Sequence, residues 1–241
     1  MAKKTKTQKY VFKAIDQEKA CSENFDRIET YKAIRTSIMF SAPKTDKGKV
    51  ITLTSAAPGE GKTSTALNLA ITFAQIGAKT LVIDADMRKS RVHRYLGLER
   101  KIGLSNILCG FASVEEATYK SIRENLDCIT AGEIPPNPAE LLGSDEFSAL
   151  IEVLVEKYEY VIIDTPPITV VTDAILVSRS STGVVLVARK NMTTYKALDA
   201  AVDGINRQNV PLLGIIFIKN GTRNRKYGYN YKSYEYSYSD K

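Results

Sequence analysis

The sequence predicts an α/β fold in which helices cover both faces of a parallel β-sheet. Short runs of β-branched and other apolar residues, the pattern of strands buried on both faces, alternate with segments of helical periodicity. A turn that contains Gly59 and Gly61 joins the first of these strands to a helix. Because such a turn lets a helix N-terminus bind a phosphate group, we expect this element to carry the function as well.

Three segments are expected along the 241 residues. Residues 1–20 are predicted to form a flexible basic arm, residues 21–220 the folded domain, and residues 221–241 a disordered tail without aliphatic side chains. The net charge of +7 divides into +5 over residues 1–13, +4 over residues 219–241 and therefore −2 between them. The basic ends suit a negatively charged partner, although basic residues also serve solubility alone.

The sequence carries no sign of a membrane span or of secretion. It contains no run of about 18 apolar residues, which a transmembrane helix requires. The basic N-terminus is not followed by the apolar stretch of a signal peptide. Cys21, Cys109 and Cys128 lack the spacing of metal ligands, so we expect reduced thiols in a cytoplasmic protein.

The first helix is predicted over residues 22–40, with Ser22 as its cap. One face of this helix is charged and carries Glu29, Lys32 and Arg35, whose spacing of three places them on one side. The apolar face consists of Phe25, Ile28, Tyr31, Ile34 and Ile38.

Residues 56–64, Ala-Ala-Pro-Gly-Glu-Gly-Lys-Thr-Ser, are predicted to bind phosphate. An apolar strand over residues 50–54 precedes them and a helix over residues 64–75 follows, which is the context of a phosphate-binding loop. Lys62 can reach the β- and γ-phosphates and the Thr63 hydroxyl can bind Mg²⁺, although the first glycine of the motif is replaced by alanine. The expected nucleotide-binding residues are Pro58, Gly59, Glu60, Gly61, Lys62, Thr63 and Ser64.

The remaining elements alternate along the chain, and only residues 97–121 show a weak pattern, expected to form loops and short helices. Strands are predicted over residues 79–84, 126–130, 160–164, 183–188 and 212–218. Helices are predicted over residues 139–158, 173–180 and 193–208.

Acidic residues follow two of these strands. Asp164 ends an apolar strand and is the natural Mg²⁺ ligand, while Asp84 and Asp86 are two positions apart and are expected to point the same way. Asp86 is placed to accept a proton from an attacking hydroxyl group. For Asp84 and Asp86, capping of a helix or solvation of a strand end is the simpler alternative. Arg88 is equally suited to a phosphate contact and to an ion pair.

Two weaker features complete the candidate sites. Asn220, just beyond the last strand, is a candidate for adenine recognition, and His93 is expected to be structural or solvated. The predicted tail contains six of the 13 tyrosines of the chain, among Gly, Asn, Lys and Ser residues. These are Tyr227, Tyr229, Tyr231, Tyr234, Tyr236 and Tyr238.

Together these motifs resemble the bacterial tyrosine kinases (BY-kinases). Val-Ile-Asp-Ala-Asp-Met-Arg at residues 82–88 is similar to their second Walker A (A′) motif, and residues 57–63 and 163–167 are similar to their Walker A and Walker B motifs. The tyrosine cluster resembles their autophosphorylated tail. The resemblance extends from about residue 25 to the end and implies a three-layer P-loop NTPase fold, with residues 21–220 as the kinase domain.

The resemblance implies that ATP and Mg²⁺ serve phosphorylation of the tail tyrosines in trans, within a ring-shaped homo-oligomer. The oligomerisation motif of the family, E-x-x-R-x-x-R, corresponds to Glu29, Lys32 and Arg35 in this sequence. Lys32 replaces the first arginine of the motif and lacks the planar guanidinium group that can form two parallel hydrogen bonds. The implied catalytic residues are Lys62, Asp84, Asp86 and Arg88, and the implied metal-binding residues are Thr63, Asp84 and Asp164.

The resemblance also implies partners. A transmembrane adaptor of the polysaccharide co-polymerase type would recruit the cytoplasmic kinase to the inner face of the membrane and activate it. A cognate tyrosine phosphatase would reverse the reaction, and the cycle would regulate the synthesis and export of capsular polysaccharide or exopolysaccharide.

Two other functions remain as alternatives. ATPase switches of the Min and Par type share the fold and the acids, but they carry a signature lysine at the position of Ala57 and lack a tyrosine tail. The cations and aromatic residues of residues 223–229 resemble tails that stack on nucleic acid, but the body is not basic, so no nucleic-acid partner is expected.

Overall fold

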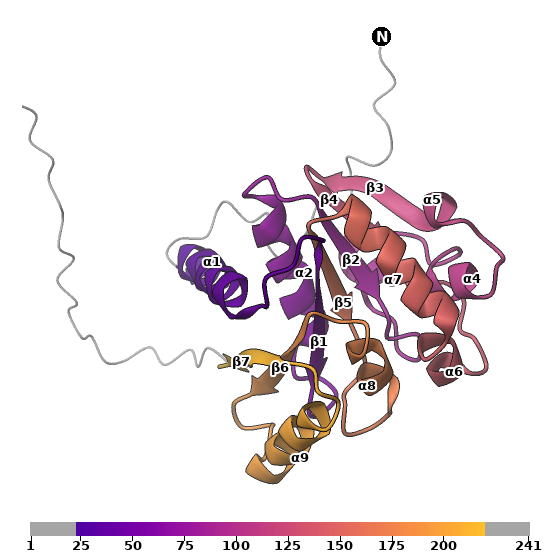
Figure 1. Ribbon diagram of the computed structural model, residues 1–241. Coiled ribbons are helices and arrows are strands. Elements are labelled where there is room, and N and C mark those ends of the chain that lie inside the picture. Colours follow the sequence, from indigo (N-terminus) through magenta and orange to yellow (C-terminus); the bar gives the residue numbers. More distant parts are fainter. Residues whose placement is uncertain (1–22, 220–241) are drawn as a thin grey trace, which may run out of the picture.

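The computed structural model describes residues 23–219 (Figure 1). The side chains of residues 23–26 are not described. The predicted basic arm, the candidate Asn220 and the six tail tyrosines lie outside the described residues.

A seven-stranded sheet forms the middle of the molecule, in the order β3-β4-β2-β5-β1-β6-β7. Neighbouring strands are parallel except β3 and β4, which are antiparallel. The sequence did not predict β3, because this edge strand is partly exposed and lacks an apolar run. The strands are β1 (Lys49–Ser55), β2 (Thr80–Asp84), β3 (Thr118–Arg123), β4 (Leu126–Ile129), β5 (Tyr160–Asp164), β6 (Gly183–Arg189) and β7 (Leu212–Ile218).

Helices cover both faces of the sheet and give the three layers that were predicted (Figure 1). Apolar side chains of α1, α2 and α3 pack on one face, and those of α4, α6, α7, α8 and α9 pack on the other. The helices are α1 (Glu23–Ser41), α2 (Lys62–Ala74), α3 (Val92–Leu96), α4 (Leu104–Leu108), α5 (Val114–Ala117), α6 (Pro138–Leu142), α7 (Asp145–Lys157), α8 (Asp173–Ser178) and α9 (Tyr195–Asn206).

The single helix predicted over residues 139–158 is wrong: the segment forms α6 and α7. Ser144 has an extended backbone, and its hydroxyl oxygen accepts a hydrogen bond from the Phe147 N–H group, which caps the start of α7. The same hydroxyl donates to the Leu141 carbonyl oxygen at 3.0 Å. The serine therefore satisfies groups at the end of one helix and at the start of the next.

The apolar residues of α1 pack as the sequence pattern predicts, but its three charged residues have different partners. Ile38 is buried and Ile34 is partly buried against the core beneath α2. Lys32 and Glu29 form an exposed ion pair at 2.7 Å. Arg35 instead donates from Nη1 to the carbonyl oxygen of Thr72 in α2, at 2.7 Å. Within one chain, Arg35 therefore fastens α1 to α2.

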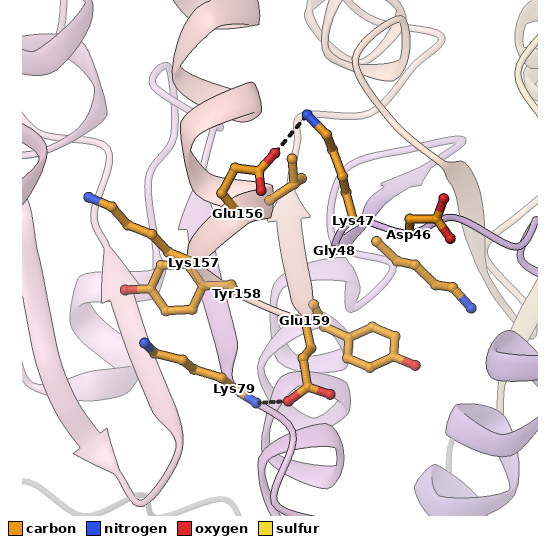
Figure 2. A pocket seen from close by; sticks show the side chains of 11 residues that line it. Asp46, Lys47, Gly48, Lys79, Glu156, Lys157, Tyr158 and Glu159 are labelled. Atoms are coloured by element: carbon orange, nitrogen blue, oxygen red, sulfur yellow. Dashed lines mark hydrogen bonds and ion pairs between the residues drawn. The ribbon is translucent and has the colours of Figure 1, made fainter.

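A pocket of about 450 Å³ lies at the amino ends of the strands, opposite the edge where their carboxyl ends meet (Figure 2). Its charged groups largely satisfy one another. Lys47 pairs with Glu156 at 2.7 Å, and Glu159 accepts a hydrogen bond from the backbone N–H of Lys79. The aliphatic chain of Lys79 also brings its ammonium group over the Tyr158 ring. We regard this pocket as structural.

Candidate active site

The phosphate-binding loop lies between β1 and α2, as the sequence predicts. Gly59 and Gly61 have φ angles of 83° and 93°, in the left-handed region that favours glycine. The helix begins at Lys62 and runs for 13 residues. Its free N–H groups therefore face the loop, at the end where the helix dipole attracts an anion.

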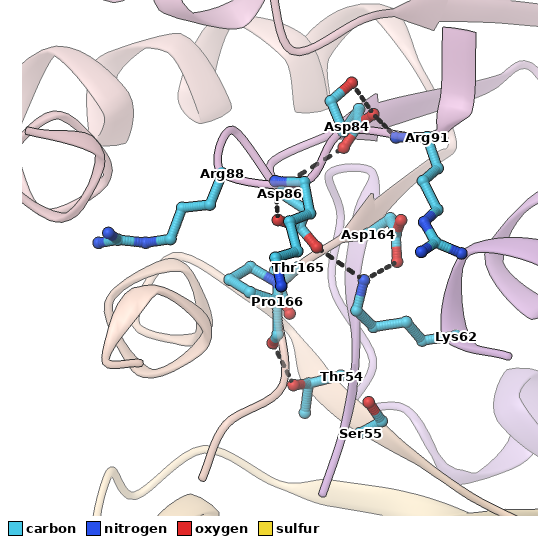
Figure 3. Close-up of polar contacts among 12 residues, drawn as sticks. Thr54, Ser55, Lys62, Asp84, Asp86, Arg88, Arg91, Asp164, Thr165 and Pro166 are labelled. Carbon is cyan, nitrogen blue, oxygen red and sulfur yellow. Dashed lines mark hydrogen bonds and ion pairs between the residues drawn. The ribbon is translucent and has the colours of Figure 1, made fainter. Parts of the chain in front are cut away.

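Lys62 lies between two carboxylates (Figure 3). Its Nζ is 3.0 Å from Oδ2 of Asp86 and 3.6 Å from Oδ1 of Asp164. Burial opposes the charge of Lys62, but the carboxylates of Asp164 and Asp86 outweigh it and raise the pKa of Lys62. The ammonium group is therefore charged, and it lies at the carboxyl ends of β2 and β5.

Asp164 fits a cation better than it fits the protein alone. The residue is fully buried, and its carboxylate is incompletely paired: Lys62 Nζ lies 3.6 Å from Oδ1, and among the described residues neither oxygen has a hydrogen-bond partner of normal geometry. Burial raises its pKa, and Lys62 works against that effect. Incompletely paired carboxylate oxygens are costly in a buried position unless a ligand pairs with them. Mg²⁺ is such a ligand, and Thr63, at the start of α2, supplies a hydroxyl group beside it.

The protein alone does not complete a metal site in the part of the chain that the structure describes. No group of three or more His, Cys, Asp or Glu residues there could hold a metal ion. Mg²⁺ commonly keeps one or two protein ligands and takes the others from substrate phosphates and water. The donor set of Thr63 and Asp164 therefore fits a magnesium ion that arrives with a nucleotide.

Asp84 does not point the same way as Asp86, contrary to our expectation. The strand β2 ends at Asp84, so Asp86 lies in the following loop. Oδ2 of Asp84 accepts hydrogen bonds from Ser90 Oγ at 2.8 Å and from the backbone N–H groups of Arg91 and Val92. Asp84 therefore caps the start of α3, which was the simpler alternative; its metal-binding role stays a prediction.

Burial and the neighbouring Asp164 carboxylate raise the pKa of Asp84 to about 7. The register explains this proximity, because Asp84 and Asp164 are paired across β2 and β5. Ser90 also links Asp84 to His93, whose Nδ1 is 3.0 Å from the serine hydroxyl. The position of His93 agrees with the structural role predicted for it.

The two carboxylate oxygens of Asp86 have different partners: one faces the candidate nucleotide pocket, and the other binds a backbone N–H group. Its Oδ2 contacts Lys62, and its Oδ1 accepts a hydrogen bond from the backbone N–H of Lys89 at 2.9 Å. The second contact fixes the carboxylate, while the first would be lost if Lys62 turned to a phosphate. Asp86 is therefore held where a hydroxyl group could reach it, and its role as a base stays a prediction.

Arg88 forms an ion pair, the second of its two predicted roles. Its Nε and Nη2 donate to the two carboxylate oxygens of Asp173 at 2.9 and 3.1 Å. Figure 3 shows the side chain extending away from Lys62 and Asp164. Arg88 lines the edge of the pocket, but in this structure its guanidinium group is committed to the first residue of α8.

We expect the Arg88→Met variant to lose about 2 kcal/mol of unfolding free energy, because the Asp173 carboxylate is fully buried and would lose its bidentate partner. Urea denaturation measures the loss. The double variant Arg88→Met, Asp173→Asn should recover most of it. Wild-type stability of the single variant, with a raised KM for ATP, would instead indicate a phosphate contact.

The side chain of Glu60 does not take part in the pocket, while the predicted phosphate contact of this loop residue stays a prediction. Its carboxylate is fully buried and does not line the pocket. Oε2 accepts a hydrogen bond from the Ala57 N–H group at 2.9 Å, and Oε1 accepts one from the Thr193 hydroxyl group. The side chain therefore supports the loop from within.

The other predicted nucleotide-binding residues line a pocket of about 310 Å³ in front of the loop. The sequence did not predict nucleotide binding by the residues that close the pocket from other segments of the chain, although Pro166 and Pro167 belong to the predicted Walker B motif. Those residues are Lys89, Arg91, Tyr95, Pro166, Pro167, Val170, Val171 and Arg189. The pocket thus combines the phosphate loop with a largely basic and apolar rim.

Comparisons with known proteins agree with this geometry. A family model described as an AAA domain matches residues 48–208, which include the phosphate loop, Asp84, Asp86 and Asp164. The tyrosine-protein kinase YwqD of Bacillus subtilis is 42% identical over 202 residues, which cover 83% of this chain and 85% of YwqD.

Longer proteins and a solved structure match as well. The tyrosine-protein kinase wzc of Salmonella typhimurium is 37% identical over 212 residues, which cover 88% of this chain but only 29% of wzc. The crystal structure of the chimerical protein CapA2B2 superposes with a TM-score of 0.78 at 36% identity, over 86% of this chain and 90% of that chain. This chain is therefore similar to these proteins both in sequence and in fold.

Proposed function

Since this chain belongs to the family of bacterial tyrosine kinases (BY-kinases), of the capsule and exopolysaccharide type, we propose that it phosphorylates its own C-terminal tyrosine cluster in trans. Tyr227, Tyr229, Tyr231, Tyr234, Tyr236 and Tyr238 are the proposed acceptors. The observation that carries the proposal is the placement of Lys62 between Asp86 and Asp164, in front of a phosphate-binding loop.

ATP would enter the pocket with its phosphates against the loop. Lys62 would then exchange its carboxylate partners for oxygens of the β- and γ-phosphates. Thr63 and Asp164 would hold the Mg²⁺ that accompanies ATP and offsets the charge of its phosphates. The N–H groups at the start of α2 would stabilise the same negative charge, so positioning and electrostatics would supply most of the catalysis.

Transfer to tyrosine needs a proton acceptor. When Lys62 turns to the phosphates, Oδ2 of Asp86 loses its ion-pair partner and is free to accept the phenolic proton. The tyrosine oxygen then forms a bond to the γ-phosphorus, the bond from that phosphorus to ADP breaks, and ADP leaves with the electron pair. The phosphotyrosine adds about −1.5 to −2 charges to a basic tail.

We expect the purified protein, incubated with Mg²⁺ and ATP, to gain several phosphoryl groups, each of which maps to a tail tyrosine. Intact mass measurement followed by peptide mapping tests this. The Asp86→Asn variant keeps the shape of the side chain but cannot accept the proton, so it should gain none. Asp199→Asn, on the exposed side of α9, is the matched control and should behave as the wild type. Release of free phosphate from ATP without modified protein would favour an ATPase switch.

The assembly and partners form the rest of the proposal. A ring of copies would bring each tail to the site of a neighbour, and the exposed pair of Lys32 and Glu29 on α1 supports a contact between copies. None of the helices in the described part of the chain is long and apolar enough to cross a bilayer. By likeness to the family, a transmembrane adaptor would recruit the kinase to the inner face of the membrane. A cognate phosphatase would reset it, and polysaccharide synthesis and export would follow the cycle.

A further inference from the structure

Side chains around the phosphate loop donate hydrogen bonds to its carbonyl oxygens. Hydroxyl groups or a guanidinium group donate to the carbonyl oxygens of four loop residues, and two of these donors come from segments that are distant in the sequence. The pairs are Thr169 with Ala56, Ser55 with Ala57, Arg189 with Gly59, and Ser64 with Gly61. A carbonyl oxygen that faced a phosphate would repel it, so this arrangement leaves N–H groups for the nucleotide.

A partly buried chain of hydrogen bonds reaches the loop from the segment between β6 and α9. The Thr193 hydroxyl oxygen accepts a hydrogen bond from the Arg189 N–H group at 2.7 Å, and the hydroxyl donates to Oε1 of Glu60. Oε2 of Glu60 accepts from the Ala57 N–H group at 2.9 Å. Because Glu60 is fully buried, the Thr193 hydroxyl is part of what compensates its carboxylate for the loss of water.

We propose that Thr193 is a positioning residue, which holds the phosphate loop through Glu60 in the conformation that binds ATP. Without the hydroxyl group, one oxygen of a buried carboxylate loses the donor that it has among the described residues, and the loop must open to admit water or let Glu60 turn outward. Either change releases the Ala57 N–H group and disturbs the array of N–H groups beside it. The segment between β6 and α9 thus sets the affinity for nucleotide, an inference that rests on the proposed binding of ATP by this loop.

The variants Thr193→Val and Thr193→Ser test the role of the hydroxyl group. We expect Thr193→Val to weaken the Kd for ATP about tenfold, the equivalent of about 1.4 kcal/mol. Calorimetry measures this Kd. The KM for ATP should rise in parallel while kcat changes little, because Thr193 touches no reacting atom. Thr193→Ser restores the hydroxyl and should bind as the wild type.

Thr194→Val is the matched control. Thr194 caps α9, where its exposed hydroxyl group accepts a hydrogen bond from the Ala197 N–H group and not from the loop. This variant should lose stability and keep its affinity for ATP. Equal weakening in Thr193→Val and Thr194→Val would overturn the inference, as would wild-type affinity in Thr193→Val. If the wild type itself fails to bind ATP, the proposed function fails instead.

A measurement on the wild type needs no variant. Since the Ala57 N–H group donates to a buried carboxylate, its hydrogen exchange without nucleotide should be slow for a loop amide. Exchange as fast as that of exposed loop amides would overturn the inference, even if Thr193→Val did not fold.

Discussion

The Lys62→Met variant is expected to lose tyrosine phosphorylation by about 10³-fold, because it lacks the ammonium group that contacts the transferred phosphate. Lys62 reaches Asp86 at 3.0 Å and Asp164 at 3.6 Å, so it stands where the phosphates, the metal and the base would meet. Methionine preserves the length of the side chain and removes only its charge and donors. Quantitative mass measurement of the phosphorylated tail follows the loss.

The same substitution should lower stability in a pH-dependent way. Without Lys62, Asp84, Asp86 and Asp164 share a buried site with no cation between them, and we expect a loss of about 3 kcal/mol near pH 8. The folded-state pKa of Asp84 is about 7, above its ordinary value of 3.8. The folded protein therefore holds more protons than the unfolded chain between these values, so unfolding free energy falls as pH rises through that window.

Lys62 opposes the rise in the pKa of Asp164, so removal of its positive charge should raise that pKa further. The stability deficit of Lys62→Met should therefore be largest above pH 7 and shrink as the pH is lowered towards the ordinary carboxyl range. Urea denaturation over a series of pH values measures it. Lys196→Met, at an exposed position of α9, is the control and should change neither activity nor stability. Full autophosphorylation by Lys62→Met would contradict the assignment of the site.

The parts of the fold that the sequence predicted are those with strong local patterns. The strands β1, β2 and β5 are buried on both faces, so their apolar runs stand out. The edge strand β3 was missed because its side chains are mostly polar and half exposed. The break between α6 and α7 was missed because Ser144 fits within an apolar helical pattern, while its capping bond needs a particular backbone conformation.

The site could be predicted where topology fixes it. In a parallel sheet the carboxyl ends of neighbouring strands meet, and so Asp84 and Asp164 lie in register beside the loop after β1. The partners of Arg88 and Glu60 could not be predicted, because each depends on the path of a distant loop. Asp173 is 85 positions from Arg88, and Thr193 is 133 positions from Glu60. Contacts between residues so far apart in the sequence cannot be predicted from the spacing of residue types.

Asp164→Asn is expected to separate catalysis from stability. We expect activity to fall by about 10²-fold or more, because the amide is a poorer ligand for Mg²⁺ and cannot balance its charge. The unfolding free energy near pH 8 should rise by about 1 kcal/mol, since the substitution removes a buried charge that is incompletely paired within the described residues. Lys62 keeps Asp86 as its partner at 3.0 Å, so no new unpaired charge results.

Asp173→Asn provides the opposite case in the same protein. This aspartate is equally buried, but Arg88 binds both of its oxygens, so neutralising it should lower stability while activity remains. Thermal unfolding with ATP, with and without Mg²⁺, gives a second measurement: Asp164→Asn should lose the increment that Mg²⁺ adds and retain part of the ATP effect. A loss of stability in Asp164→Asn as large as that in Asp173→Asn would mean that Asp164 serves the fold. A gain in stability together with lost catalysis would mean that its incompletely paired charge is kept for the metal.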